Sequence, residues 1–293
     1  MRLDAQVHAW FSEHPRRPWD PGYRPAHKDK PSYLQHAGQT NSPDMVITEM
    51  DSVGVQGALL VPVGVYGTDI EVELEASEAH PDRFQTIGLV DHLAPDLAAH
   101  LERSRARGLR GMRLLGMREP DRIDRNEFDE VLSLAADLGL VVTLSLAHPL
   151  DQRLPEIFRR HPQVFFYIDH LGTGYAPPIL GWRPEKPFEH LATVLSLADI
   201  PNVGIKLTGA PSLSFETYPF VDIWSPVLDL ITAFGPDRVS WGSDYSRTAA
   251  LHSYWDATHY LAEIPGLSHD QLEMLYAGSL MLRTGWRPTA EEA

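Results

Sequence analysis

The feature that most constrains the fold is a regular alternation of short apolar runs with amphipathic helical segments. Eight runs rich in Val, Ile, Leu and Phe have the length and composition of buried strands. They cover residues 3–10, 57–63, 84–91, 109–115, 140–146, 165–171, 203–208 and 239–245. Helical segments follow them at 43–50, 68–80, 95–107, 126–138, 150–160, 188–197, 221–234 and beyond the last strand. Each strand is therefore followed by a helix.

Eight strand–helix units in 293 residues predict a closed (β/α)8 TIM barrel, with residues 1–293 forming a single domain. A doubly wound open sheet is the alternative, but no glycine-rich turn follows the first strand. Long loops after strands 1, 6 and 7 are expected to distort the barrel. The first of them, residues 11–42, is rich in proline and aromatic residues and predicts an ordered lid or rim.

Composition excludes several classes of protein. A net charge of -15 argues against a nucleic-acid surface and an anionic membrane face. The absence of cysteine excludes thiolate metal sites and cysteine nucleophiles. No apolar stretch approaches membrane-spanning length, and the N-terminus lacks the pattern of a signal peptide, so we expect a cytoplasmic protein. We expect a small-molecule substrate, and a homo-oligomer, such as a dimer, because aromatic loop residues could bury a subunit interface.

Polar residues gather where the predicted strands end, which is where barrel enzymes place their chemistry. They are Gln6, His8, Arg110, Arg113, His148, His170, Lys206 and Asp244. Each alone has a structural explanation: His148 could cap a helix, Lys206 could pair with a carboxylate, and Asp244 could be an N-cap. Together they predict one polar basin. Ideal alternation along the first strand would place Asp4, Gln6 and His8 on one face.

Several of these segments resemble the amidohydrolase superfamily. The similarity lies in Asp4-Ala5-Gln6-Val7-His8, Gly111-Met112-Arg113, Asp169-His170-Leu171-Gly172, Val203-Gly204-Ile205-Lys206-Leu207-Thr208-Gly209 and Trp241-Gly242-Ser243-Asp244. The most similar branch is the amidohydrolase-2 type, which includes hydrolases of sugar lactones, sulfomuconolactone and pyrone dicarboxylate. The resemblance implies a hydrolase that opens a lactone or another cyclic ester.

The resemblance also implies site residues. His8 matches the second His of the family's His-any-His pair, His170 the strand-six His, and Asp244 the strand-eight Asp. His148 could serve as the strand-five His. Gln6 stands where the first His of the pair is found, and Arg113 stands where binuclear members carry a bridging Lys or Glu.

The loss of one imidazole and of the bridge makes a binuclear centre the least favoured arrangement. Two hypotheses stay open. Either no metal is required, or a single divalent ion (Zn or Mn) is held at partial occupancy by His8, His170 and Asp244. Without a metal, Asp244 would be the general base, while His8, His170 and Gln6 would polarise the ester carbonyl.

Arginines suggest an acidic substrate, because a guanidinium binds carboxylate or sulfonate with two hydrogen bonds. The expected substrate-binding residues are Arg113, Arg118, His148, Lys206, Arg247 and Tyr175. For Arg118 and Arg247, pairing with acidic neighbours such as Glu119 is an equal alternative. Two other functions stay open: a metal-dependent decarboxylase of an aromatic or unsaturated acid, and a barrel that only binds a ligand.

Overall fold

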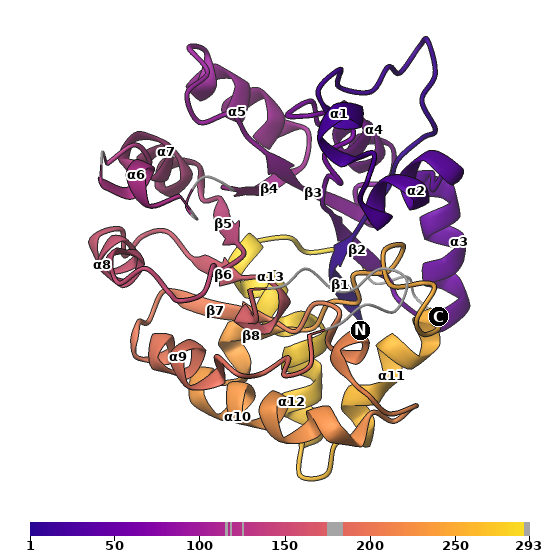
Figure 1. Ribbon diagram of the computed structural model, residues 1–293, viewed down its shortest axis with the longest axis vertical. Helices are drawn as coiled ribbons and strands as arrows, with labels where there is room; N and C mark the ends of the chain where they lie inside the picture. Colours follow the sequence, from indigo (N-terminus) through magenta and orange to yellow (C-terminus); the bar gives the residue numbers. More distant parts are fainter. Residues whose placement is uncertain (115–116, 118, 125, 175–183, 290–293) are drawn as a thin grey trace.

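Eight parallel strands form one closed sheet in the computed structural model, which describes residues 1–114, 117, 119–124, 126–174 and 184–289. Strand order follows the sequence. The strands are β1 Leu3–Val7, β2 Gly57–Leu60, β3 Phe84–Leu89, β4 Leu109–Arg113, β5 Val141–Leu144, β6 Phe166–Ile168, β7 Val203–Lys206 and β8 Val239–Ser240. The segment after β8 closes the ring, since the Asp244 amide donates to the Gln6 carbonyl at 3.0 Å. The predicted (β/α)8 barrel is confirmed (Figure 1).

Helices surround the strands on the outside of the barrel (Figure 1). They are α1 Tyr23–His27, α2 Pro31–Gly38, α3 Pro43–Val53, α4 Glu71–Ala79, α5 Leu97–Ala106, α6 Pro120–Asp124, α7 Asp129–Leu138, α8 Arg153–Arg160, α9 Leu191–Leu195, α10 Trp224–Phe234, α11 Tyr254–Glu263, α12 His269–Glu273 and α13 Ser279–Thr284. Local sequence explains several helix starts. Ser253 and Ser268 each begin a reciprocal capping box, which satisfies amides that the first helical turn leaves unpaired.

Two apolar layers hold the barrel together. Side chains such as Leu59, Val61 and Tyr167 fill the interior of the ring. Their neighbours along the strands, such as Leu60 and Ile168, pack in the larger layer between sheet and helices. Because successive side chains on a strand point to opposite faces, both faces of each strand are buried. This double burial explains why the strands read as continuous apolar runs.

β1 departs from the regular alternation expected for it. Its pairing with β2 shifts register between Asp4 and Val7. Asp4 consequently lies on the helix side, where the Tyr254 hydroxyl of α11 donates to its Oδ2 at 2.9 Å. Gln6 and His8 instead reach Asp244 inside the ring. The expectation that Asp4 shares a face with Gln6 and His8 is therefore wrong, because the irregularity interrupts the two-residue period.

The stretch between β1 and α3 forms a lid, which we define as residues 11–42. It contains α1 and α2, and its Trp19 and Tyr23 pack with Trp10 and Val65 in a separate apolar cluster. Backbone hydrogen bonds in both directions between Trp10 and Asn41 join its two ends. The proline and aromatic residues of this stretch thus build ordered structure, as the sequence predicted.

Within the described ranges, none of the helices combines the length and the apolar character that crossing a membrane requires.

Gly204 of β7 tests how closely the strands are packed. A Cβ atom at this position would lie 2.3 Å from the Arg238 carbonyl oxygen and 2.7 Å from the Phe165 ring. We expect Gly204→Ala to destabilise the protein by about 1–3 kcal/mol, because backbone must move to make room. Urea unfolding measures this. Gly38→Ala is the control, since nothing lies within 4 Å of a Cβ there, and equal stability of both variants would contradict the expectation.

Candidate active site

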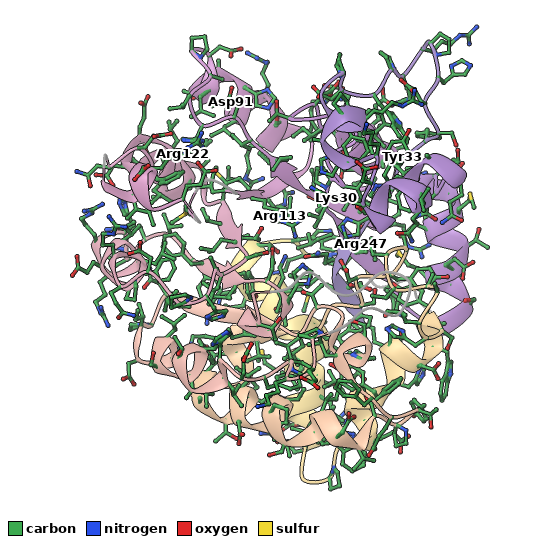
Figure 2. The ribbon with its side chains drawn as sticks, viewed as in Figure 1. Lys30, Tyr33, Asp91, Arg113, Arg122 and Arg247 are labelled. Atoms are coloured by element: carbon green, nitrogen blue, oxygen red, sulfur yellow. The ribbon has the colours of Figure 1, made fainter. Side chains whose placement is uncertain are left out.

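The interior of the barrel changes from apolar to polar toward the C-terminal ends of the strands. Five side chains from five strands or the residues directly after them meet in this polar layer: Gln6, Arg113, Asp169, Lys206 and Asp244. Lys206 and Asp244 are completely buried, whereas the Arg113 side chain keeps 13% of its surface exposed. Arg113 and Arg247 lie near the centre of the ring in Figure 2. Of the residues predicted for one polar basin, Gln6, Arg113, Lys206 and Asp244 do meet, whereas Arg110 Nη1 donates to the Arg105 and Leu109 carbonyls instead.

Asp244 is held by two donors from β1. His8 Nε2 lies 2.8 Å and Gln6 Nε2 lies 2.9 Å from the same carboxylate oxygen, Oδ1. The second oxygen, Oδ2, has no hydrogen-bond partner in the part of the chain that the structure describes. Burial alone would raise the pKa of Asp244, but the hydrogen bond and charge of His8 and the charge of His170 hold it well below its usual range. Asp244 is therefore an ionised carboxylate with one oxygen available as a base.

The contacts fix the orientation of Gln6 and hold the ring of His8. Arg113 Nη2 donates to Gln6 Oε1 at 3.0 Å, so the amide group of Gln6 must face Asp244. His8 Nδ1 lies 2.6 Å from the Val61 carbonyl, and its Nε2 lies 2.8 Å from Asp244 Oδ1. In this arrangement, Gln6 and His8 hold the base rather than a substrate carbonyl.

Asp169 joins the two cations on the opposite side of the layer. Its Oδ2 accepts from Arg113 Nη2 at 2.9 Å, and its Oδ1 lies 3.2 Å from Lys206 Nζ. Burial opposes ionisation of Asp169, but the charges of Lys206 and Arg113 outweigh it and lower the pKa to about 2. Lys206 is thus paired with a buried carboxylate, which is the structural alternative considered for it, and its role in substrate binding stays a prediction.

His170 is a neutral imidazole next to this layer. Burial lowers its pKa to about 4, against the opposing charge of Asp244. Its Nδ1 lies 3.4 Å from the Thr208 carbonyl, which leaves Nε2 with its lone pair. His170 and Asp244 both adopt positive φ angles, 53° and 56°. Residues other than glycine rarely occupy this region, and such strain is concentrated at functional sites.

The other predicted substrate-binding residues differ in their placement. Arg247 Nε lies 3.6 Å from Asp244 Oδ2, so Arg247 belongs to the site. His148 Nε2 lies 2.7 Å from the Gly172 carbonyl, and its ring stacks on His190 with centroids 4.0 Å apart. These contacts of His148 are structural. Arg118 and Tyr175 lie outside the described residues.

Two positioning residues were missed by sequence reasoning. Asp4 Oδ1 accepts the backbone amides of Gln6 at 3.0 Å and Ser243 at 2.9 Å, and so fixes the backbone next to Asp244. Burial raises the pKa of Asp4 to about 6. Asn41 of the lid donates to the His8 carbonyl at 2.6 Å and the Ser246 hydroxyl at 2.8 Å. An acidic residue in an apolar strand was a signal for Asp4, whereas nothing in the sequence marks Asn41.

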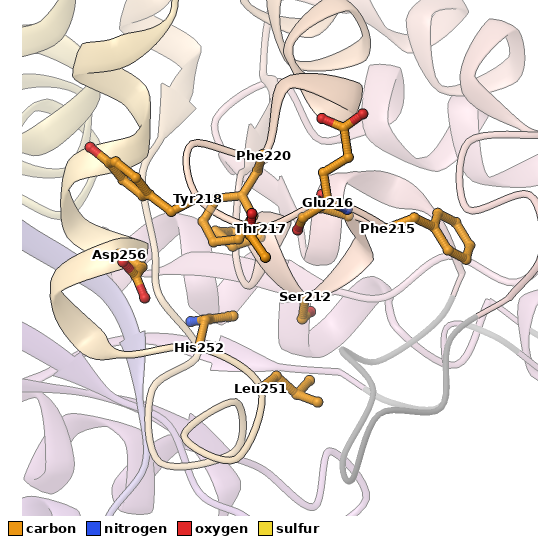
Figure 3. A pocket seen from close by; sticks show the side chains of 11 residues that line it. Ser212, Phe215, Glu216, Thr217, Tyr218, Phe220, Leu251, His252 and Asp256 are labelled. Atoms are coloured by element: carbon orange, nitrogen blue, oxygen red, sulfur yellow. Dashed lines mark hydrogen bonds between the residues drawn. The ribbon is translucent and has the colours of Figure 1, made fainter.

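A hollow of about 330 Å³ opens beside the polar layer, between the segments that follow β7 and β8. Ser212, Phe220, Leu251 and His252 are among the residues that line it (Figure 3). It has the size to take a small organic molecule.

The donor set, as arranged, does not fit a divalent metal. Gln6 turns its amide hydrogens toward Asp244, and the two ring nitrogens of His8 lie against the Val61 carbonyl and Asp244 Oδ1. A metal needs lone pairs from its ligands, and the guanidinium of Arg113 adds positive charge where the ion would lie. Among the described residues, no three His, Asp or Glu side chains converge as a metal-binding group.

Comparison with curated proteins finds two similar enzymes. The chain is 27% identical over 205 residues to a 4-sulfomuconolactone hydrolase of Hydrogenophaga intermedia, and 25% identical over 198 residues to one of Rhizobium radiobacter. Each match covers 67% of this chain. The chain spans 62% and 63%, respectively, of the length of these relatives.

Solved structures share the fold at low identity. An amidohydrolase of Burkholderia multivorans with bound zinc has a TM-score of 0.78 at 19% identity, covering 98% of this chain and 100% of that one. A probable 2-pyrone-4,6-dicarboxylic acid hydrolase of Acinetobacter baumannii has a TM-score of 0.71 at 18% identity, covering 97% and 99%. A manganese-bound dihydroxybenzoic acid decarboxylase of a Polaromonas species has a TM-score of 0.66 at 14% identity, covering 97% and 96%.

A match to a family model confirms the resemblance that the sequence predicted. The model of the amidohydrolase family Amidohydro_2 matches residues 3–278, which include both the β1 residues that hold Asp244 and Asp244 itself. The chain therefore belongs to the amidohydrolase family Amidohydro_2.

Proposed function

We propose that the chain hydrolyses a lactone or another cyclic ester that carries an acidic group, with Asp244 activating the attacking water. One observation carries the proposal: Asp244 is an ionised, buried carboxylate whose Oδ1 accepts two hydrogen bonds, while its Oδ2 accepts none among the described residues and has only the Arg247 guanidinium 3.6 Å away. The curated relatives, which are named as hydrolases of a sulfonated lactone, support the choice of substrate class.

The chemistry follows from the contacts around Asp244. A water molecule near Oδ2 loses a proton to Asp244 as its oxygen attacks the carbonyl carbon, and the lone pair of His170 Nε2 orients this water. The guanidinium group of Arg113 stabilises the oxyanion. Collapse of the tetrahedral intermediate breaks the bond to the ring oxygen, which takes the proton from Asp244. Water is thereby added across the ester, and the product is a hydroxy acid.

The roles of Gln6 and His8 differ from those expected at first. Both were predicted to polarise the carbonyl, but their donors point at Asp244 Oδ1. We propose that they keep Asp244 ionised and fixed, which leaves oxyanion stabilisation to Arg113. A lactone suits this site better than an amide, because an alkoxide or enolate leaving group needs less proton assistance than an amine.

Charge favours an anionic substrate. The polar layer holds three cationic side chains and two carboxylates: Lys206, Arg113, Arg247, Asp169 and Asp244. Three minus two leaves one net positive charge, in a protein whose overall net charge is -15. A carboxylate or sulfonate on the substrate would balance this local excess.

We propose that the reaction needs no metal. The arrangement of Gln6 and Arg113 places a fixed positive charge beside the base without offering free ligand atoms. The alternative with a single zinc or manganese ion, and the metal-dependent decarboxylase, both require His8 and Asp244 to give up their mutual hydrogen bond.

Removal of the base tests the mechanism. Asp244→Asn should lower kcat for 4-sulfomuconolactone by about 10²–10⁴-fold, because the amide cannot accept the proton of water. Steady-state kinetics measure this. Asp51→Asn is the matched control, since Asp51 lies exposed on α3 and pairs only with Arg83 among the contacts found for it. Undiminished turnover by Asp244→Asn would rule out Asp244 as the base.

The pH dependence gives a second test. Ionised Asp244 and neutral His170 are both required, and both pKa values are lowered, that of His170 to about 4. Activity should therefore persist at pH 5 and be lost as the pH falls through about 4, where His170 becomes protonated. A profile of kcat/KM over the pH range in which the fold is intact measures this. An acid limb near the ordinary pKa of histidine, about 6.5, would contradict it.

Metal removal separates the two chemistries. We expect lactone hydrolysis to survive dialysis against a chelator, and elemental analysis to find far less than one zinc or manganese per chain. Stoichiometric metal together with loss of activity on chelation would instead support the decarboxylase, and release of CO₂ from aromatic acids would then be assayed.

A further inference from the structure

Unpaired polar atoms gather where the lid meets the segment after β8. Gln35 Oε1, His36 Nε2, Asp244 Oδ2 and Arg247 Nε are all buried without a hydrogen-bond partner among the described residues, and the last two lie 3.6 Å apart as an ion pair. Gln35 Nε2 donates to the Ser246 carbonyl, which brings α2 against the residue before Arg247. A buried polar group without a partner costs about 1–3 kcal/mol. Such a cluster is typical of a site whose ligand supplies the missing partners.

His36 presents a fixed hydrogen-bond donor to this cluster. Its ring is 1% exposed and packs edge-on against Trp10, with centroids 4.9 Å apart. Burial, followed by the charges of Arg247 and His8, lowers the pKa of His36 to about 3, so the ring is neutral. Burial raises the pKa of Tyr23 to about 12, so Tyr23 keeps its proton. The Tyr23 hydroxyl lies 2.6 Å from Nδ1. Because a phenol is the stronger donor and an imidazole nitrogen the stronger acceptor of this pair, we expect the hydroxyl to donate to Nδ1, with the hydrogen of the ring on Nε2.

The lid holds this donor in place from two sides. Gln35, the neighbour of His36 on α2, is bonded to the Ser246 carbonyl, and Asn41 is bonded to the Ser246 hydroxyl and the His8 carbonyl. The lid therefore keeps a constant position relative to β1 and to Arg247. Donors fixed before binding lose less entropy when a ligand arrives.

We propose that His36 and Arg247 form an anion subsite that binds the carboxylate or sulfonate group of the substrate beside Asp244. The inference rests on the proposed function and extends it, since it assigns substrate selection to a lid residue. An anionic oxygen accepts from both the imidazole and the guanidinium. An uncharged lactone leaves both buried donors unpaired, so it is discriminated against.

The test compares an acidic and an uncharged lactone. The measured quantity is the ratio of kcat/KM for 4-sulfomuconolactone to kcat/KM for dihydrocoumarin. We expect His36→Gln to lower this ratio by about tenfold or more. Tyr23→Phe keeps the aromatic ring of residue 23 but removes the hydroxyl that fixes the tautomer of His36. This variant should lower the ratio by a smaller factor. His14→Gln is the control, because His14 lies exposed on the same lid, and its ratio should stay within about twofold of the wild type.

A binding measurement separates this inference from the proposed reaction. Calorimetry with cis,cis-muconate, an unreactive dicarboxylate, should show about tenfold weaker binding to His36→Gln than to the wild type. If 4-sulfomuconolactone is hydrolysed but the ratio and the binding are unchanged in both variants, the subsite is wrong and the hydrolase stands. If no lactone is hydrolysed but muconate binding depends on His36, the subsite stands and the reaction is wrong. If no lactone is hydrolysed and muconate binding does not depend on His36, both the subsite and the reaction are wrong.

Thermal unfolding shows whether each variant is folded. Tyr23→Phe decides the question if His36→Gln fails to fold, since a folded Tyr23→Phe variant with an unchanged substrate ratio would overturn the inference.

Discussion

The hydrogen bonds between β1 and Asp244 are the interaction on which both the fold and the site depend. His8 and Asp244 are separated by 236 residues, yet their side chains lie 2.8 Å apart because the barrel closes between them. The Asp244 amide donates to the Gln6 carbonyl at the same junction, so backbone pairing and side-chain pairing support each other. Asp4 strengthens this junction from the helix side, because its carboxylate accepts hydrogen bonds from the backbone amides of Gln6 and Ser243. Closure of the ring thus places the candidate base.

A network of charged and polar side chains extends from this junction across the barrel. Arg113 bonds both Gln6 and Asp169, and Asp169 pairs with Lys206. Buried charges are costly unless they are paired, and here each carboxylate has at least one cationic neighbour. The amide of Gln6 is well suited to this network because it accepts from Arg113 with its oxygen and donates to Asp244 with its nitrogen. A neutral imidazole, with one donor and one acceptor nitrogen, lacks the second donor hydrogen that this amide carries.

Much of the fold was predictable, and the reason is physical. Strands buried on both faces are apolar throughout, and the helices that cover them are amphipathic. The order of strands and helices can therefore be predicted from local composition. The helix expected from residue 43 is α3, and the Ser42 side chain caps it by accepting from the Met45 amide. The alternation of β1 was predicted wrongly because the register shift between Asp4 and Val7 arises from pairing with β2, which local sequence does not encode. The contacts of His148 with Gly172 and His190 also come from distant segments.

The sequence by itself determined the barrel, the family resemblance and the identity of Asp244, His8, Gln6 and His170 as candidate residues, because periodicity and short motifs are local properties. Only the tertiary structure decided how these residues act on one another. Which oxygen of Asp244 is occupied, which way the Gln6 amide faces and how Gln35 of the lid meets Ser246 all depend on contacts between segments far apart in the chain. Such contacts exist only once the ring has closed, since closure is what brings β1, the lid and the segment after β8 together.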